Sequence, residues 1–260
     1  MVIGLGCQGY NTMKNEVIAY GVLAGGKVIP KVHWFGEVGH YNTIIMEMLG
    51  PSLTELFQMC GRTFSLKTVL MLADQLLYGV EYVHSKGILH GNIKPDNLLM
   101  GMERKSHTLH IVDYGLAEPY WDWRTEEHIA WTDQCNSVRG SLRYISVRAH
   151  QGIQPSRRDE LESVIYVLMH WSMGGKLPWP GSVDRSDSDM SRKIMRAKVR
   201  STAPGAWDER FPQVFAGCVI YCRALKFQAR VAQNAVLRTK PFGILQTFCF
   251  RLEAERFARI

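Results

Sequence analysis

The stretch His90-Gly91-Asn92-Ile93-Lys94-Pro95-Asp96-Asn97 carries the strongest local signal in this chain. Sixteen residues after Asn97 comes Asp113-Tyr114-Gly115, directly behind a short apolar run at residues 109–112. In phosphoryl transfer a lysine can neutralise the charge of the phosphoryl group, while an asparagine and an aspartate can hold magnesium. Phosphoryl-transfer chemistry requires such groups to converge, so Lys94, Asn97 and Asp113 are candidates for one site.

Two long amphipathic helices are predicted on either side of this stretch. Apolar residues recur at spacings of three and four through residues 65–86 and again through residues 159–172, which is the pattern of one buried helix face. Ser65 can cap the start of the first helix, and Gly87 can end it. Short apolar pieces and polar loops lie between the two helices, so the sequence predicts an α+β fold.

The part of the chain before residue 50 differs in character. It offers one short helix candidate around residues 16–23 and strand-like runs at residues 32–35 and 41–48. Leu49-Gly50-Pro51 then breaks the pattern. The predicted boundaries are a small sheet-bearing lobe at residues 1–48, a larger helical lobe at 49–228 and a divergent basic tail at 229–260.

Composition limits the class of protein. Hydrophobic residues make up 46% and charged residues 21% of the chain, as in ordinary globular proteins. No apolar run approaches the roughly 20 residues that span a bilayer, and the first residues do not resemble a secretory leader. The six cysteines are scattered, which favours reduced, mostly buried thiols and a cytoplasmic or nuclear location. The net charge of +7 is concentrated after residue 220, where no nucleic-acid motif accompanies it. We expect a monomer with no membrane and no specific nucleic-acid partner.

The motifs closely resemble the casein kinase I family of eukaryotic serine/threonine protein kinases. The resemblance runs from about Glu16 to Gln228 and implies a two-lobed kinase fold, ATP with Mg²⁺, and protein or phosphopeptide substrates or binding partners. The segments that carry it are Glu47-Met48-Leu49-Gly50-Pro51-Ser52-Leu53, Phe64-Ser65-Leu66-Lys67-Thr68-Val69-Leu70, Lys94-Pro95-Asp96-Asn97, Ser146-Val147-Arg148, Ser156-Arg157-Arg158-Asp159-Glu160-Leu161-Glu162-Ser163 and Leu177-Pro178-Trp179.

The same resemblance implies that Lys94 is catalytic and that Asn97 and Asp113 are metal ligands. It also implies further binding residues. Met46, Glu47 and Leu49 would belong to the hinge that contacts adenine, with Leu99 on the floor of that pocket. Glu16 matches the helix glutamate that contributes to the nucleotide site. Arg143 and Gly181 match two members of a basic site for phosphate groups on substrates. Two readings of Arg143 stay open, an anion ligand and a brace for the activation segment.

The catalytic loop departs from the family at its most important position. The family has His-Arg-Asp where this chain has His90-Gly91-Asn92. The aspartate accepts or orients the proton of the substrate hydroxyl, whereas the amide of Asn92 is uncharged and a very poor base. A general base contributes about 10²–10⁴ in rate, so the resemblance places Asn92 at the catalytic position without its chemistry.

The amino-terminal region departs as well. Kinases pair the helix glutamate with a strand lysine, but the only basic residue upstream of Glu16 is Lys14, which is too near in sequence to lie on a separate strand. We therefore expect Glu16 to be an exposed helix acid. Gly4-Leu5-Gly6-Cys7-Gln8-Gly9 fits a phosphate-binding glycine loop, yet six residues before Glu16 cannot form two further strands at about 3.3 Å per residue. A flexible segment is expected there.

Three functional readings follow. The first is a pseudokinase that acts as a binding module, with weak or absent binding of ATP and Mg²⁺. The alternative is an active serine/threonine kinase whose glycine loop and strand lysine lie upstream of this sequence, as the retained Lys94, Asn97 and Asp113 suggest. A third reading is a gene remnant, which the unmatched tail favours. Fold alone does not choose among them, because function depends on the site.

Overall fold

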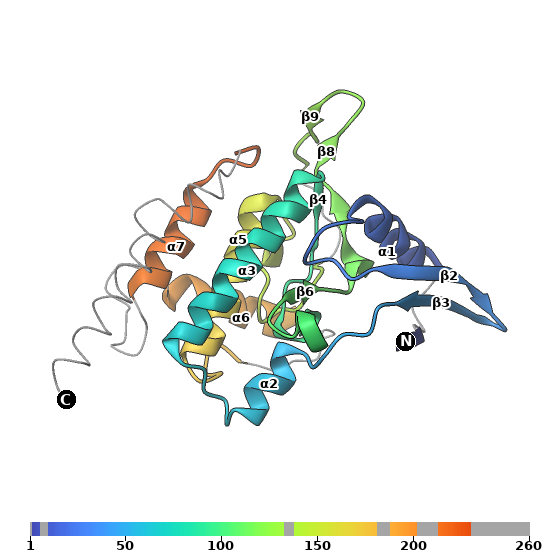
Figure 1. Ribbon diagram of the computed structural model, residues 1–260. Helices are drawn as coiled ribbons and strands as arrows, with labels where there is room; N and C mark the ends of the chain where they lie inside the picture. The colour runs from blue at the N-terminus through green and yellow to red at the C-terminus, as the bar shows by residue number, and fades with distance from the viewer. Residues whose placement is uncertain (1, 6–9, 133–137, 181–187, 202–212, 230–260) are drawn as a thin grey trace.

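Figure 1 shows the computed structural model, which describes residues 2–5, 10–132, 138–180, 188–201 and 213–229. A small sheet with one helix lies on one side, and a larger, mostly helical part lies on the other, so the predicted α+β class is confirmed. The elements of the small part are β1 (Val2–Leu5), α1 (Tyr10–Val22), β2 (Val32–Val38) and β3 (Tyr41–Met46).

The small sheet has three antiparallel strands in the order β1-β3-β2. Val2 pairs with Met46 and Leu5 with Thr43, so β1 lies along the whole of β3. The expectation of a flexible segment is therefore wrong for residues 2–5, although residues 6–9 of the glycine motif lie outside the described part. The sequence of β1 is Val-Ile-Gly-Leu, so this strand supplies no lysine.

Helix α1 is anchored to the large lobe. Ala19, Tyr20 and Leu23 are buried in the same hydrophobic core as α3 and α5, and α1 packs against the turn that follows Asp113. In contrast, the β2–β3 ribbon leaves Trp34 and Tyr41 exposed. The small lobe thus combines a firmly packed helix with a solvent-exposed ribbon.

The large lobe is built around two helices that lie side by side in the centre of Figure 1, α3 and α5. The Ser65 hydroxyl accepts a hydrogen bond from the Thr68 backbone at the start of α3, and Gly87 follows its end with φ of +76°, as predicted. A capping box between Ser156 and Asp159 begins α5. The helices of this lobe are α2 (Leu53–Met59), α3 (Leu66–Ser85), α4 (Val147–His150), α5 (Arg157–Ser172), α6 (Ser188–Ser201) and α7 (Gln213–Ala224).

Short strands and turns lie between α3 and α5 in the sequence and carry the predicted site residues from Asn92 to Asp113. The strands pair in three antiparallel ladders, β4 with β7, β5 with β6 and β8 with β9. The strands are β4 (Ile88–Leu89), β5 (Leu98–Met100), β6 (Leu109–Ile111), β7 (Glu118–Pro119), β8 (Trp121–Asp122) and β9 (Glu127–His128), and the 3-10 helices are η1 (Pro95–Asn97), η2 (Glu103–Lys105) and η3 (Tyr114–Leu116).

The expectations about membrane-spanning segments and free cysteines can be compared with the described residues. Every helix among them is too short or too polar to cross a bilayer. Cys60, Cys218 and Cys222 are free thiols, of which Cys60 is exposed and the other two are buried. Cys7, Cys135 and Cys249 lie outside the described residues.

Candidate functional site

The catalytic loop brings three predicted residues together. The amide nitrogen of Asn97 donates to the Asn92 carbonyl oxygen at 3.0 Å and to the Asp113 carboxylate at 3.1 Å. Asp113 adopts a left-handed backbone conformation with φ of +68°, which is costly for a residue other than glycine and is common at functional sites. The convergence of Asn97 and Asp113 that their spacing predicts is therefore present.

Asn92 is buried, and its side-chain oxygen accepts a hydrogen bond from the Ser141 hydroxyl at 3.0 Å. The amide is uncharged and almost without basicity, so this side chain cannot take a proton from a substrate hydroxyl. Ser141 was missed at the sequence level because it lies 49 residues away in the chain. Lys94 is half-buried directly before η1, on the same loop as Asn92.

Three aromatic rings connect α1 to the catalytic loop. Tyr114 contacts Tyr20 at a centroid distance of 5.1 Å and His90 at 4.7 Å. The Tyr20 hydroxyl also accepts a hydrogen bond from the Asp113 backbone N–H at 3.2 Å. Tyr20 follows Glu16 by four residues and hence lies on the same helix face, a spacing that could have identified it. Helix α1 thus helps to position Asp113.

The hydroxyl of Tyr114 is buried with no hydrogen-bond partner among the described residues. We expect Tyr114→Phe to raise the free energy of unfolding by about 1–2 kcal/mol, because a buried hydroxyl without a partner carries an uncompensated desolvation cost. Urea unfolding measures the change. The matched variant Tyr20→Phe should have the opposite sign, since it removes the acceptor for Asp113. A loss of stability in Tyr114→Phe would contradict the prediction and indicate a bound water.

Glu16 is not the exposed acid that the sequence predicts. Its side chain is half-buried, and the Tyr114 backbone N–H donates to its carboxylate. Burial, followed by the nearby Asp113 carboxylate, raises the pKa of Glu16 to about 7. The packing of α1 on η3 causes this difference, because it turns Glu16 towards Asp113 and away from solvent.

The hinge residues and Leu99 lie next to one another. Gly50 donates to the Met100 carbonyl at 2.8 Å, and Met100 donates to the Pro51 carbonyl at 3.1 Å, so the chain after Leu49 runs along β5 beside Leu99. Met46 ends β3 and packs on the core. The Glu47 carboxylate pairs with Lys105 at 3.0 Å. These positions are compatible with a hinge that borders a nucleotide.

The anion-site residues are only partly described. Arg143 donates through its guanidinium to the Gly175 carbonyl, and the Trp179 indole donates to the Arg143 carbonyl at 2.9 Å. These contacts brace the segment that contains Arg143. Gly181 lies outside the described residues.

Glu160, on α5, contacts the catalytic loop and was not singled out at the sequence level. The side chain of Glu160, on α5, is only 4% exposed. It accepts hydrogen bonds from His84 Nε2 at 2.8 Å and from the Gly91 backbone N–H at 2.8 Å. Burial alone would raise the pKa of Glu160, but these bonds and the neighbouring histidines lower it overall. Glu160 therefore ties α5 to α3 and to the loop.

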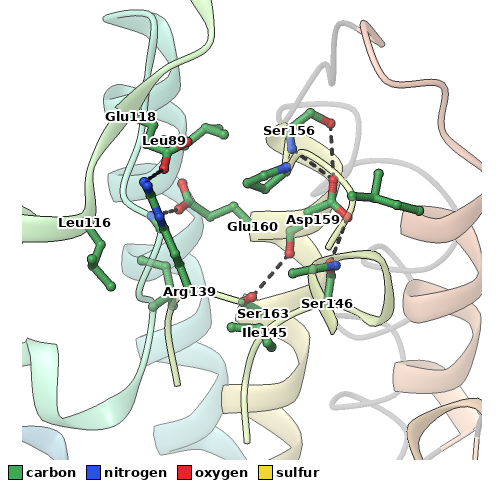
Figure 2. A pocket seen from close by; sticks show the side chains of 15 residues that line it. Leu89, Leu116, Glu118, Arg139, Ile145, Ser146, Ser156, Asp159, Glu160 and Ser163 are labelled. Atoms are coloured by element: carbon green, nitrogen blue, oxygen red, sulfur yellow. Dashed lines mark hydrogen bonds and ion pairs between the residues drawn. The ribbon is translucent and has the colours of Figure 1, made fainter. Parts of the chain in front are cut away.

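A cavity of about 60 Å³ adjoins this carboxylate, between the catalytic loop, the activation segment (residues 113–146) and α5 (Figure 2). Arg139 lies along one wall and forms an ion pair with Glu118. Gly91 has φ of +77°, and a Cβ atom there would meet the Leu116 carbonyl oxygen at 2.5 Å. The backbone therefore has no room for the arginine that the family carries at position 91.

Asn97 and Asp113 carry the side-chain oxygens that would hold a metal ion at this site. Asn97 uses its amide nitrogen for hydrogen bonds to Asn92 and Asp113, which leaves its side-chain oxygen as the atom that would bind a metal ion, and Mg²⁺ prefers oxygen ligands. Magnesium and ATP, when bound, supply the phosphoryl group and the charge that stabilises its transfer. However, β1 is Val-Ile-Gly-Leu and supplies no lysine partner for Glu16.

Comparison with known families agrees with this geometry. The family model described as Protein kinase domain matches residues 7–238, which is most of the chain.

Proposed function

The chain belongs to the protein kinase domain family, and from this premise we propose that it is a casein-kinase-I-type pseudokinase, a binding module that does not transfer phosphate. The observation that carries the proposal is the buried Asn92 amide at the position of the catalytic base, hydrogen-bonded to Ser141. The casein kinase I assignment rests on the motifs between Glu47 and Trp179.

The electrostatics of the nucleotide site support the same proposal. Glu16 lies beside Asp113, and β1 carries no lysine to separate the two carboxylates. Two neighbouring carboxylates repel the phosphates of ATP unless cations intervene. The alternative of an active kinase needs both a base and a strand lysine, so it is not favoured.

The accompanying proposals concern ligands and setting. Mg²⁺ would bind at Asn97 and Asp113, and ATP would bind weakly along the hinge. The partners would be proteins or phosphopeptides, and the chain would act as a monomer in the cytoplasm or nucleus.

We expect no measurable phosphoryl transfer from labelled Mg-ATP to casein-like or pre-phosphorylated peptides. Ordinary kinases turn over at roughly 1–100 per second, and loss of the base removes about 10²–10⁴ of that rate. Asn92→Asp alone should not restore activity, because the lysine partner of Glu16 would still be missing. The assay compares the chain, Asn92→Asp and Asp113→Asn beside an active casein kinase.

Turnover within tenfold of the active kinase would refute the proposal. Recovery in Asn92→Asp, abolished again by Asp113→Asn, would show that the base is the sole defect.

A thermal melt tests nucleotide binding separately, since a ligand at 100 times its dissociation constant adds about 2.7 kcal/mol to the stability.

A further inference from the structure

A groove of about 610 Å³ lies on the surface between α1 and the β8–β9 hairpin, beside the segment that follows Asp113. One wall is a stripe on α1 formed by Asn15, Ile18, Ala19 and Val22, at positions i, i+3, i+4 and i+7. The opposite wall is formed by Trp121 and Trp123. The volume falls within the range of about 300–1,000 Å³ that is usual for ligand sites.

The walls of this groove expose large apolar side chains. Ile18 is 64% exposed, Val22 is 44% exposed and Trp123 is 63% exposed. The rings of Trp121 and Trp123 contact each other edge to face at 6.2 Å, which holds Trp123 in place above the groove. Contiguous exposed apolar surface of this kind marks interaction sites in soluble proteins, and tryptophan is frequent where binding energy is concentrated.

The charged side chains that line the groove differ in whether they form an ion pair. Glu118 is paired with Arg139, and the remaining charged side chain is Lys86. Its ammonium lies 5.5 Å from the centre of the Tyr82 ring, and no carboxylate of the described residues is within ion-pair distance of it. The groove therefore presents an apolar channel with one uncompensated positive charge at its edge.

We propose that this groove binds an amphipathic helix of a partner protein, with apolar side chains against the α1 stripe and the tryptophans and a carboxylate opposite Lys86. The spacing of the α1 stripe suits a second helix, whose anchors recur at i, i+3, i+4 and i+7. The hairpin strands are two residues each, which is too short an edge for an added strand. The proposal rests on the binding-module function and specifies the chemistry of the partner.

The test uses the full chain and a labelled helical peptide with leucines at i, i+3, i+4 and i+7, flanked by glutamates. The same peptide with lysines in place of the glutamates is the charge control. We expect the glutamate peptide to bind at least tenfold more tightly than the lysine peptide by fluorescence anisotropy. Ile18→Asn and Trp123→Ala should each weaken binding by about tenfold or more, and Lys86→Glu should reverse the charge preference. Trp34→Ala, at an exposed tryptophan on β2, is the matched control and should bind normally.

Three results would overturn the proposal. The first is that the glutamate peptide does not bind. The second is that Trp34→Ala weakens binding as much as Trp123→Ala does. The third is a dimer of the chain, seen by light scattering, that Trp123→Ala dissociates, since the groove would then belong to a second copy. Thermal melts of each variant ensure that lost binding does not reflect unfolding. The proposed lack of catalysis is tested by phosphoryl transfer, so either idea can fail without the other.

Discussion

Glu160→Ala is expected to lower the free energy of unfolding by about 3–5 kcal/mol, because it removes one partner of a buried charged network. The loss leaves the His84 imidazole and the Gly91 backbone N–H without the acceptor that each contacts at 2.8 Å. It also enlarges the adjoining cavity of about 60 Å³, which adds a packing cost. Because most domains are stable by only about 5–15 kcal/mol, this variant should be close to unfolding.

Urea unfolding with circular dichroism measures this effect. Glu160→Gln keeps an acceptor for Gly91 and should lose less stability than the alanine variant. Glu37→Ala, at an exposed position on β2, is the matched control and should change stability by less than about 0.5 kcal/mol. A loss below about 1 kcal/mol in Glu160→Ala would show that water replaces the carboxylate.

The pKa of Glu160 is lowered by its hydrogen bonds and the neighbouring histidines, despite burial. A carboxylate with a lowered pKa stabilises the fold above its ordinary pKa near 4.5, and this contribution is lost as the pH falls through the folded value. The difference between the native chain and Glu160→Ala should therefore shrink in acid.

Local sequence patterns predicted the large lobe well because its helices depend on local signals. The apolar spacing lies within α3 and α5 themselves, and the capping residue Ser65 directly precedes α3. Strand β1 was mistaken for a flexible segment because its evidence is not local. Its partner is β3, about 40 residues further along the chain, and four residues with one glycine give no clear strand pattern.

The candidate site likewise combines contacts that a local pattern predicts with contacts that depend on long-range packing. The contact between Asn97 and Asp113 could be predicted from their order and spacing, and the structure places the Asn97 amide nitrogen 3.1 Å from the Asp113 carboxylate. The burial of Glu16 could not be predicted in this way, because it depends on how α1 packs against the turn after Asp113. The contacts of Glu160 with His84 and Gly91 span 76 and 69 residues, and no local pattern records such a pairing.

The half-buried Glu16 gives the protein a pH dependence of the opposite sign to that of Glu160. Burial and the Asp113 charge raise the pKa of Glu16 to about 7, whereas in the unfolded chain it lies near 4.5. The folded protein therefore holds a proton that the unfolded chain releases between these values. The stabilising contribution is fully present below pH 4.5 and is lost as the pH rises through about 7.

We expect Glu16→Gln to be more stable than the native chain by about 1–3 kcal/mol at pH 8.5, because the amide resembles the protonated acid and cannot repel Asp113. At pH 5 the two proteins should differ little, since Glu16 is then already neutral. Urea unfolding at both pH values measures the change, with Glu37→Gln on the exposed ribbon as the control. Equal stabilities of Glu16→Gln and the native chain at pH 8.5 would show that the Glu16 and Asp113 carboxylates do not repel each other in the folded protein. A gain that disappears when millimolar Mg²⁺ is added would instead place the cation between these carboxylates, where the lysine of an active kinase would otherwise act.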